Sequence, residues 1–312
     1  MPKILFTRRF RKTSGSHLRT SGTHLKVRDY FMHCLQHPRL EPYLYFTPDS
    51  EYEDSEVWAE VPRGRIVREI AINGYDTLFL TGKDWKLLPK TYKGKAIINL
   101  LQSLEQCDEA HWVFRYLKKP AYRICVSREI LEAIRPHVAE PAVVIRNGIP
   151  LELFHPAPNK NENTILIWAR KQPELGERLF QTLQQRGRAV TLLRDYLPRA
   201  QFALRLSESD LFVCLPQAQE GFYLPALEGM ASGCAVVCAD ALGNREFCMH
   251  GQTCLMPVHG DYDDHLRMIE HLLVERELKE RIQQQGLTLA QAYSLENEQK
   301  QFYRFVEEFI LN

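Results

Sequence analysis

Two glutamates stand eight positions apart, separated by a turn-forming sequence. They are Glu220 and Glu228, and Gly-Phe-Tyr-Leu-Pro follows the first of them. Gly221 permits a sharp turn, and Pro225 suits the first residue of a helix because its missing N–H would be unpaired there anyway. The free N–H groups at the start of such a helix favour an anion such as a phosphate. The spacing therefore predicts an anion-binding turn beside Glu220, with Glu228 about one turn inside the helix.

The elements around this turn are predicted from apolar runs and glycines. Residues 211–215 have the length and composition of a buried strand, Gly233 ends the helix, and residues 235–238 begin the next strand. Glu220 then lies in the loop after the carboxyl end of a strand, where open α/β sheets bind ligands. The alternative is an ordinary helix start with solvated acids.

Residues 220–233 read EGFYLPALEGMASG. This segment resembles E-G-F-G-L-P-x-L-E-A-M-A-x-G, the donor-site signature of retaining glycosyltransferases of the GT-B fold, close to glycosyltransferase family 4 (glycosyl transferases group 1). The main departures are Tyr223 in place of a glycine and Gly229 in place of an alanine. The resemblance covers nearly the whole second half of the chain and is thinner over the first.

The resemblance implies a role for each part of the turn. Glu220 approaches the donor sugar and orients it, and Glu228 holds the ribose hydroxyls of the nucleotide. The backbone of four residues contacts sugar hydroxyls and the distal phosphate, namely Gly221, Phe222, Tyr223 and Leu224.

Two cations follow another predicted strand, residues 164–168. Arg170 stands where the family has an arginine, and the resemblance implies that it binds the diphosphate. Its planar guanidinium suits phosphate oxygens and offsets charge on a leaving group. The family's lysine, about five residues further on, is not in its expected place. Either Lys171 replaces it or the second cation is missing; the alternative is that both side chains are solvated loop charges.

Loops after other strands offer further donor contacts. Three residues follow the predicted strand at residues 189–193, namely Arg194, Asp195 and Tyr196. One of them is expected to stack on or bond to the nucleotide base, and Tyr196 is the candidate. Gly22 precedes a helix and resembles the family's glycine-rich first loop, where backbone amides approach a phosphate; a plain turn is the alternative. For the histidine that the family often has near the sugar, Gln102 is the positional candidate and His111 the chemical one.

Composition narrows the class of protein. The chain has 312 residues, of which 45% are hydrophobic and 25% charged, which predicts a soluble protein of about two domains. No apolar run approaches the roughly 18 residues of a membrane helix. The eight cysteines fit neither a zinc site nor a disulfide framework, so reduced thiols and a cytoplasmic location are expected. No acidic cluster has the pattern of a metal site, and we expect neither metal nor cofactor.

Charge is unevenly divided along the chain. Residues 1–150 carry 24 Lys and Arg against 17 Asp and Glu, and residues 151–312 carry 16 against 22. The basic first half favours an anionic acceptor or a peripheral place at the inner, anionic face of a membrane. The alternative is a solvated loop formed by Arg8, Arg9, Arg11 and Lys12. Nucleic acid is not an expected partner, because no DNA- or RNA-binding pattern appears.

Short apolar runs alternate with helical periodicity, which predicts an α/β protein with mostly parallel sheets. Residues 147–163 are rich in Pro and Asn and are typical of a linker. The resemblance implies the GT-B architecture, with two Rossmann-like domains facing a cleft. The expected domains are an acceptor-side domain at 1–150, a nucleotide-sugar domain at 151–294, and a terminal helix at 295–312 that crosses back to the first domain.

The resemblance implies a glycosyltransferase of the hexosyltransferase type. It would move a hexose from a UDP- or GDP-linked sugar to a hydroxyl of a glycan or lipid-linked acceptor, with retention and without metal, as in polysaccharide biosynthesis. One alternative is a sugar phosphorylase on the same scaffold. Another is a catalytically inactive nucleotide- or glycan-binding scaffold, which the displaced lysine and the missing histidine favour.

Overall fold

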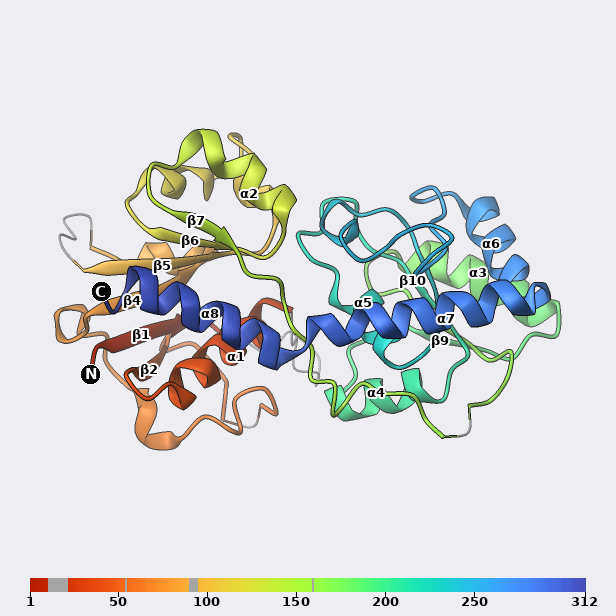
Figure 1. The fold of residues 1–312 in the computed structure, drawn as a ribbon, viewed down its shortest axis with the longest axis horizontal. Helices are drawn as coiled ribbons and strands as arrows, with labels where there is room; N and C mark the ends of the chain where they lie inside the picture. Colours follow the sequence, from red (N-terminus) through yellow and green to blue (C-terminus); the bar gives the residue numbers. More distant parts are fainter. Residues whose placement is uncertain (11–21, 54, 90–94, 159) are drawn as a thin grey trace. The chain divides into compact units, whose positions relative to one another are not determined.

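The structure is a computed structural model that describes residues 1–10, 22–53, 55–89, 95–158 and 160–312. The chain divides into two compact units (Figure 1). Unit 1 comprises Met1–Arg146 and Glu298–Asn312, and unit 2 comprises Asn147–Asn297. Each unit is built on its own parallel sheet.

Within the described residues, unit 1 contains a seven-stranded parallel sheet in the order β3-β2-β1-β4-β5-β6-β7. Because β1 pairs with β2 on one side and β4 on the other, the strand order reverses at β1. The strands are β1 Lys3–Arg8, β2 Glu41–Phe46, β3 Ile66–Val67, β4 Thr77–Thr81, β5 Ala96–Leu101, β6 Tyr122–Cys125 and β7 Ala142–Val144. The longer helices are α1 Gly22–Gln36, α2 Arg128–Ile134 and most of α8 Leu295–Phe309.

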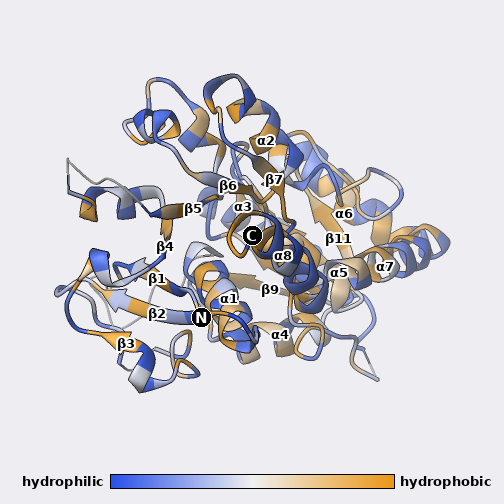
Figure 2. Cartoon of the chain, turned by 60° about the vertical axis from the view of Figure 1, so that its left-hand side comes forward, coloured by the Kyte–Doolittle hydropathy of each residue, from blue (hydrophilic) through white to orange (hydrophobic). Residues whose placement is uncertain are grey.

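Helix α8 packs on α1 through aromatic side chains. Phe302 meets Tyr30 at a ring-centroid distance of 5.0 Å, and Tyr30 lies 5.4 Å from Phe79 on β4. Figure 2 shows both hydrophobic and hydrophilic residues on α8, as expected of a helix that covers a core with one face. The predicted packing of the terminal helix on the first domain is confirmed.

A buried ionic cluster also joins α1 to α8. Lys26 Nζ lies 2.8 Å from Asp29 Oδ2 and 2.5 Å from Glu298 Oε2. His33 Nε2 lies 3.3 Å from Glu298 Oε1. Burial alone would lower the pKa of Lys26, but Asp29 and Glu298 outweigh it and raise that pKa. The ammonium group therefore stays charged inside the packed interface, where its partners satisfy it.

Within the described residues, unit 2 contains a four-stranded parallel sheet in the order β11-β10-β8-β9. Trp168 on β8 stands opposite Cys214 on β10 and Leu193 on β9, so these strands end at one edge. The strands are β8 Ile165–Trp168, β9 Val190–Leu193, β10 Leu211–Cys214 and β11 Ala235–Cys238. The helices are α3 Pro173–Gln185, α4 Arg199–Ser207, α5 Leu224–Ala231, α6 Tyr262–Val274 and α7 Arg276–Ala290.

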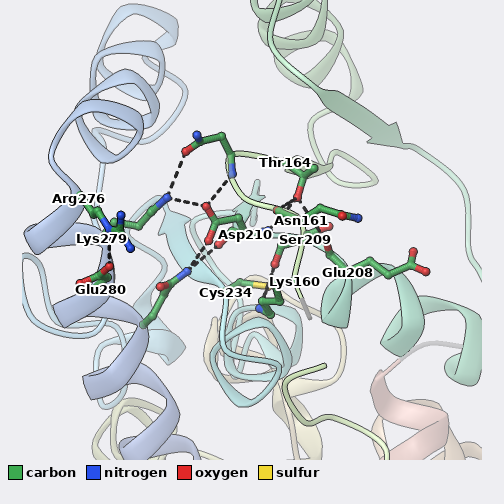
Figure 3. Close-up of polar contacts among 12 residues, drawn as sticks. Lys160, Asn161, Thr164, Glu208, Ser209, Asp210, Cys234, Arg276, Lys279 and Glu280 are labelled. Carbon is green, nitrogen blue, oxygen red and sulfur yellow. Dashed lines mark hydrogen bonds and ion pairs between the residues drawn. The ribbon is translucent and has the colours of Figure 1, made fainter. Parts of the chain in front are cut away.

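At the other edge of this sheet, Asp210 ties α7 to the start of β10 (Figure 3). Lys279 Nζ donates to its Oδ2 at 2.6 Å, and Gln283 Nε2 donates to its Oδ1 at 2.7 Å. The N–H of Asn163 also donates to Oδ2, at 2.9 Å. Burial would raise the pKa of Asp210, but the hydrogen bonds from Lys279, Asn163 and Gln283 lower it. This network fixes the amino ends of the strands.

Several local predictions can be compared directly with the structure. The helix stop at Gly233 is confirmed by its φ of +71°. One detail is wrong, because α5 begins at Leu224 and Pro225 is its second residue. All eight cysteines are free thiols, as their spacing predicts. No helix among the described residues is long and apolar enough to cross a bilayer.

Both expectations for the basic N-terminal side chains, a surface that meets anions and a solvated loop, are wrong for Arg8. Arg8 is the last residue of β1 and 6% exposed, and its Nη1 lies 3.3 Å from Asp84 Oδ2. It therefore belongs neither to a solvated loop nor to a surface that meets anions. Arg9 is half exposed and lies 2.8 Å from Asp49 Oδ2. Arg11 and Lys12 lie outside the described residues.

Candidate active site

The loop between β10 and α5 is held by the turn at residues 242–244. Gly243 N–H donates to the carbonyl of Glu220 at 2.9 Å, and Leu242 N–H donates to that of Ala218 at 3.1 Å. A Cβ on Gly243 would lie 2.1 Å from the carbonyl carbon of Gly221, so a larger residue would displace the loop. The fold thus fixes the backbone on which Glu220 stands.

Glu220 and Lys171 face each other at the carboxyl ends of β10 and β8. Lys171 Nζ lies 3.2 Å from Glu220 Oε1, and the Glu220 side chain keeps 19% of its surface exposed. The contact does not have hydrogen-bond geometry, and Oε1 is a buried atom with no hydrogen-bond partner among the described residues. A carboxylate held beside a cation in this way can accept a hydroxyl group of a ligand through the exposed part of the side chain.

Three backbone N–H groups, at and just before the start of α5, are available to bind an anion. Those of Phe222, Tyr223 and Leu224 have no hydrogen-bond acceptor among the residues that the structure describes. The side chains of the same residues are buried, with exposed fractions of 9%, 3% and 7%. The backbone, rather than the side chains, is therefore the part that can bind a ligand, and the helix dipole favours a phosphate there.

Tyr223, which stands in place of the family's glycine, is part of the core. Its hydroxyl is buried and has no hydrogen-bond partner within the described part of the chain. Burial raises the pKa of this phenol well above its usual value. Tyr223 therefore stays neutral, and its O–H remains a donor without an acceptor.

Glu228, one turn inside α5, forms an ion pair with Arg199 at the start of α4. Arg199 Nη1 donates to Glu228 Oε1 at 2.6 Å, and Glu228 is 1% exposed. The guanidinium carbon of Arg199 lies 4.6 Å from the centre of the Phe154 ring. The pair fixes the direction of the Glu228 carboxylate.

The sequence analysis does not identify Arg199. The sequence feature that could have identified Arg199 is its position directly after Pro198, at the first residue of a helix. A cation is disfavoured there by the helix dipole, so a nearby carboxylate is expected to hold it. The partner stands 29 residues further along the chain, which local patterns cannot reveal.

Arg170, Lys171 and Tyr196 all follow strands that end at the same edge. Arg170 is half-buried two residues after β8, and Tyr196 is half-buried three residues after β9. Arg194 instead forms an ion pair with Glu177 on α3. The structure thus brings Arg170, Lys171 and the Glu220 loop to one edge of the sheet.

Two further side chains, which the sequence analysis does not identify, stabilise this edge of the sheet. Gln172 Nε2 donates to the carbonyl of Pro216, and His259 Nε2 lies 3.0 Å from the same oxygen. Pro216 follows β10, so these contacts join the start of α3 to the loop that carries Glu220. Nothing in the local sequence around Gln172 or His259 indicates this pairing.

The remaining candidate residues belong to unit 1. Gly22 is the first residue of α1, and the rest of the glycine-rich first loop, residues 11–21, lies outside the described residues. Gln102 follows β5, and its N–H donates to Gln106 Oε1 at 3.0 Å. His111 accepts the N–H of Val113 through Nδ1 at 3.4 Å, as in a structural turn.

A buried polar cluster lies at the carboxyl ends of β1 and β4. Arg8 Nε donates to His24 Nδ1 at 3.3 Å, while its Nη1 pairs with Asp84. Burial, and next to it the charge of Arg8, lower the pKa of His24 to about 3. Burial raises the pKa of Asp84 to about 6, although Arg8 opposes the shift. His24 is therefore neutral at pH 7.

A known family model matches most of the residues of unit 2. Residues 152–288 match the family model of glycosyl transferases group 1. This range holds Arg170, Lys171, Arg199, Glu220 and Glu228. No curated protein matches the chain.

Solved structures match over the whole chain. Sucrose-phosphate synthase from Thermosynechococcus elongatus is 17% identical, with a TM-score of 0.77 and 100% of both chains covered. HepE from Anabaena in complex with UDP-glucose is 14% identical, with a TM-score of 0.72, 99% of this chain and 100% of that chain covered. A glycosyltransferase from Rickettsia africae ESF-5 is 12% identical, with a TM-score of 0.66, 100% of this chain and 99% of that chain covered. At these identities the matches establish the fold, which is that of the GT-B enzymes.

Proposed function

We propose that this chain, which belongs to the glycosyl transferases group 1 family, moves a hexose-type sugar from a nucleotide diphosphate sugar to a hydroxyl of a glycan or lipid-linked acceptor. The family assignment makes it a glycosyltransferase that uses nucleotide sugars. The hexose, the acceptor class, the retention of configuration and the independence from metal are our proposals. The UDP-glucose bound by HepE, a protein of the same fold, supports a uridine diphosphate donor.

One observation carries the donor assignment. The N–H groups of Phe222, Tyr223 and Leu224 have no acceptor among the described residues, and they lie in the same loop as the Oε1 atom of Glu220, which also lacks a hydrogen-bond partner there. A sugar phosphate offers both kinds of partner, because its phosphate oxygens accept hydrogen bonds and its hydroxyl groups donate them. In this proposal the loop backbone binds the distal phosphate and the Glu220 carboxylate accepts a sugar hydroxyl.

Two cations supply the positive charge that the reaction needs. Negative charge grows on the diphosphate as its bond to the sugar breaks, and groups already in place stabilise it best. Arg170 and Lys171 follow β8, and Lys171 lies 3.2 Å from Glu220. In this proposal both side chains, together with the start of α5, stabilise the leaving diphosphate. Lys171 thereby takes the place of the family's displaced lysine.

Retention of the anomeric configuration does not require a strong protein base. The leaving diphosphate takes the proton of the acceptor hydroxyl on the face from which it departs. The sugar thus keeps its anomeric configuration, and Glu220 orients the sugar without exchanging a proton.

Glu228 is the proposed ribose ligand, positioned by Arg199. The 2.6 Å contact occupies Oε1 of the carboxylate and fixes its plane. In this proposal the other carboxylate oxygen accepts the hydroxyls of the ribose, and Tyr196 contacts the base. The site then selects nucleotides by the two hydroxyl groups of the ribose.

Nucleotide binding tests this proposal before any acceptor is known. Isothermal titration with UDP, GDP, ADP, dTDP and CMP should show binding of one of these nucleotides. We expect that nucleotide to be UDP or GDP. The Glu228→Gln variant should bind that nucleotide about tenfold more weakly, a loss of about 1.4 kcal/mol. Binding of inorganic phosphate with no preference for any nucleotide would contradict the proposal and favour a phosphorylase.

A further inference from the structure

Unit 1 contains a pocket of about 710 Å³ that the donor assignment does not use. It lies over the amino ends of β5 and β6, since Lys95 directly precedes β5 and Lys119 stands three residues before β6. The candidate residues Arg8 and Gln102 stand instead at the carboxyl ends of strands in this sheet. The pocket lining thus includes none of Arg8, His24 and Asp84, although Trp85 directly follows Asp84 in the chain.

Two parallel aromatic rings form part of the wall. Trp85 and Tyr116 stack with a centroid distance of 5.4 Å and an interplanar angle of 7°. Arg123 supports them from inside, with its guanidinium carbon 5.8 Å from the centre of the Trp85 ring. Trp85 is only 4% exposed, so the apolar lining that a ligand meets is completed by other residues, namely Leu88, Pro89, Ile97 and Pro120. An apolar lining of this kind suits a ring-shaped ligand.

The buried Arg123 also makes this wall rigid. Its guanidinium donates to the backbone carbonyls of Ala121 and Lys119 at 2.7 Å each, and to those of Tyr116 and Leu117 at 3.1 and 3.2 Å. These bonds fix the segment that carries Tyr116 and Lys119 without using either side chain. The pocket is thus preformed, which reduces the entropy cost of binding.

The described lining residues include four cationic side chains and no acidic one, although Lys95 Nζ lies 3.8 Å from Asp76 Oδ1 outside the lining. The cations of the rim are Lys86, Lys95, Arg115 and Lys119. Arg115 is oriented by the ring beside it, because its Nη2 donates to Tyr116 Oη at 3.2 Å and its guanidinium carbon lies 5.0 Å from the ring centre. Lys86 Nζ lies 4.2 Å from the centre of the Trp112 ring. Cations oriented in this way bind carboxylate, sulfate or phosphate groups.

We infer that this pocket binds an acidic saccharide. The ring of the sugar packs on the apolar lining, and its anionic group meets the cations of the rim. The volume lies within the range of about 300–1,000 Å³ that is usual for small-molecule sites, which leaves room for more than a free anion. This inference goes beyond the proposed function and does not depend on it, because the pocket and the donor loop share no residue.

The chain offers a matched pair of variants to test this site. Lys118 and Lys119 are neighbouring exposed lysines, and only Lys119 lines the pocket. The probe is a tetramer of α-1,4-linked galacturonic acid, and its methyl ester is the neutral control with the same rings. Isothermal titration at low salt measures both ligands, and the melting temperature of each variant shows that it is folded.

The inference predicts a clear pattern of affinities. The acidic tetramer should bind the wild-type protein, Lys119→Glu should weaken binding at least about tenfold, and Lys118→Glu should change it less than about twofold. The methyl ester should bind at least about tenfold more weakly than the acid, and added salt should weaken the acid further.

Three results would overturn the inference. Equal affinity for the acid and its methyl ester would show that charge is not recognised. Equal losses in Lys118→Glu and Lys119→Glu would show that general surface charge, and not this pocket, attracts the ligand. Binding of inorganic phosphate or of phosphatidylglycerol vesicles that is lost in Lys119→Glu, with no binding of the tetramer, would assign the pocket to another ligand.

Discussion

Arg199 at the start of α4 holds Glu228 in α5 through a contact of 2.6 Å. Glu228 is 1% exposed, and the side chain of Arg199 keeps 19% of its surface exposed. Burying a carboxylate is costly unless a charged group pairs with it. The pair therefore links the stability of unit 2 to the residue that we assign to ribose binding.

Removing Arg199 should reduce both stability and nucleotide affinity. Arg199→Ala leaves Glu228 as an unpaired buried charge, and we expect a loss of about 2–3 kcal/mol in the free energy of unfolding, because the partly exposed guanidinium makes the pair weaker than a wholly buried one. Nucleotide affinity should fall about tenfold, because the carboxylate loses its fixed direction. Urea unfolding and isothermal titration measure the two effects.

Arg205 on the same helix is the control. It is 57% exposed, and its Nη1 lies 3.7 Å from Glu208 Oε2 at the surface. Arg205→Ala should change stability by less than about 0.5 kcal/mol and leave nucleotide affinity unchanged. Equal effects of the two substitutions would contradict the role of Arg199. The double variant Arg199→Ala with Glu228→Gln should recover part of the stability, because no buried charge remains unpaired.

Glu220 and Lys171 should affect turnover more than binding. Glu220→Gln keeps the shape of the side chain but weakens the contact to the sugar, and Lys171→Ala removes positive charge near the leaving diphosphate. We expect kcat for donor breakdown to fall about 100-fold in the first and about 10-fold in the second, with smaller changes in KM. Glu208→Gln, at the amino end of β10, should leave kcat unchanged. A rise in KM alone would mean that these residues only bind the donor.

Asp210 should make the stability of unit 2 depend on pH in acid. Its pKa is lower in the folded protein than the value of 3.8 for a free side chain. Its contribution is therefore fully present above that value and is lost as the pH falls through the lowered pKa of the folded state. Asp210→Asn should lose about 3 kcal/mol at pH 7, because Lys279 is left buried without its charged partner.

The difference between wild type and Asp210→Asn should shrink as the pH is lowered below about 4. Urea unfolding from pH 7 to pH 2 measures it. A difference that stays constant over this range would show that the charge of Asp210 is not what stabilises the network.

Gly229 stands where the family has an alanine, and Phe212 explains the change. A Cβ on Gly229 would lie 2.5 Å from Cδ1 of Phe212, which is fully buried on β10. Gly229→Ala should destabilise the protein by about 1–3 kcal/mol, although an alanine within an unobstructed helix would stabilise it by about 1 kcal/mol. Adding Phe212→Leu should remove part of the loss. Stabilisation by Gly229→Ala alone would rule out the clash.

Local signals in the sequence predict much of the sheet and helix framework. The apolar runs at β1, β5, β8 and β10 are strands because parallel strands are buried on both faces. Gly233 ends α5 because its φ of +71° favours glycine. The motif at residues 220–233 also places Glu220 in the loop at the carboxyl end of β10.

Contacts between residues far apart in the chain could not be predicted. The pairing of Arg199 with Glu228 and the packing of Phe212 against Gly229 depend on how helices lie on the sheet, and no local pattern encodes them. The neighbouring arginines in the sequence predict a basic loop for Arg8. In the structure Arg8 is instead buried beside Asp84. The pocket at Trp85 and Tyr116 is likewise formed by short helical turns without a strong sequence signal.

The most direct test of the donor assignment is the release of nucleotide from UDP-, GDP-, ADP-, dTDP- and CMP-sugars without an added acceptor. We predict slow release from one donor, UDP- or GDP-linked, that is lost in Glu220→Gln and in Arg170→Ala and retained in Glu208→Gln. Release from none of the donors, together with no rise in melting temperature with any nucleotide, would contradict the proposed function.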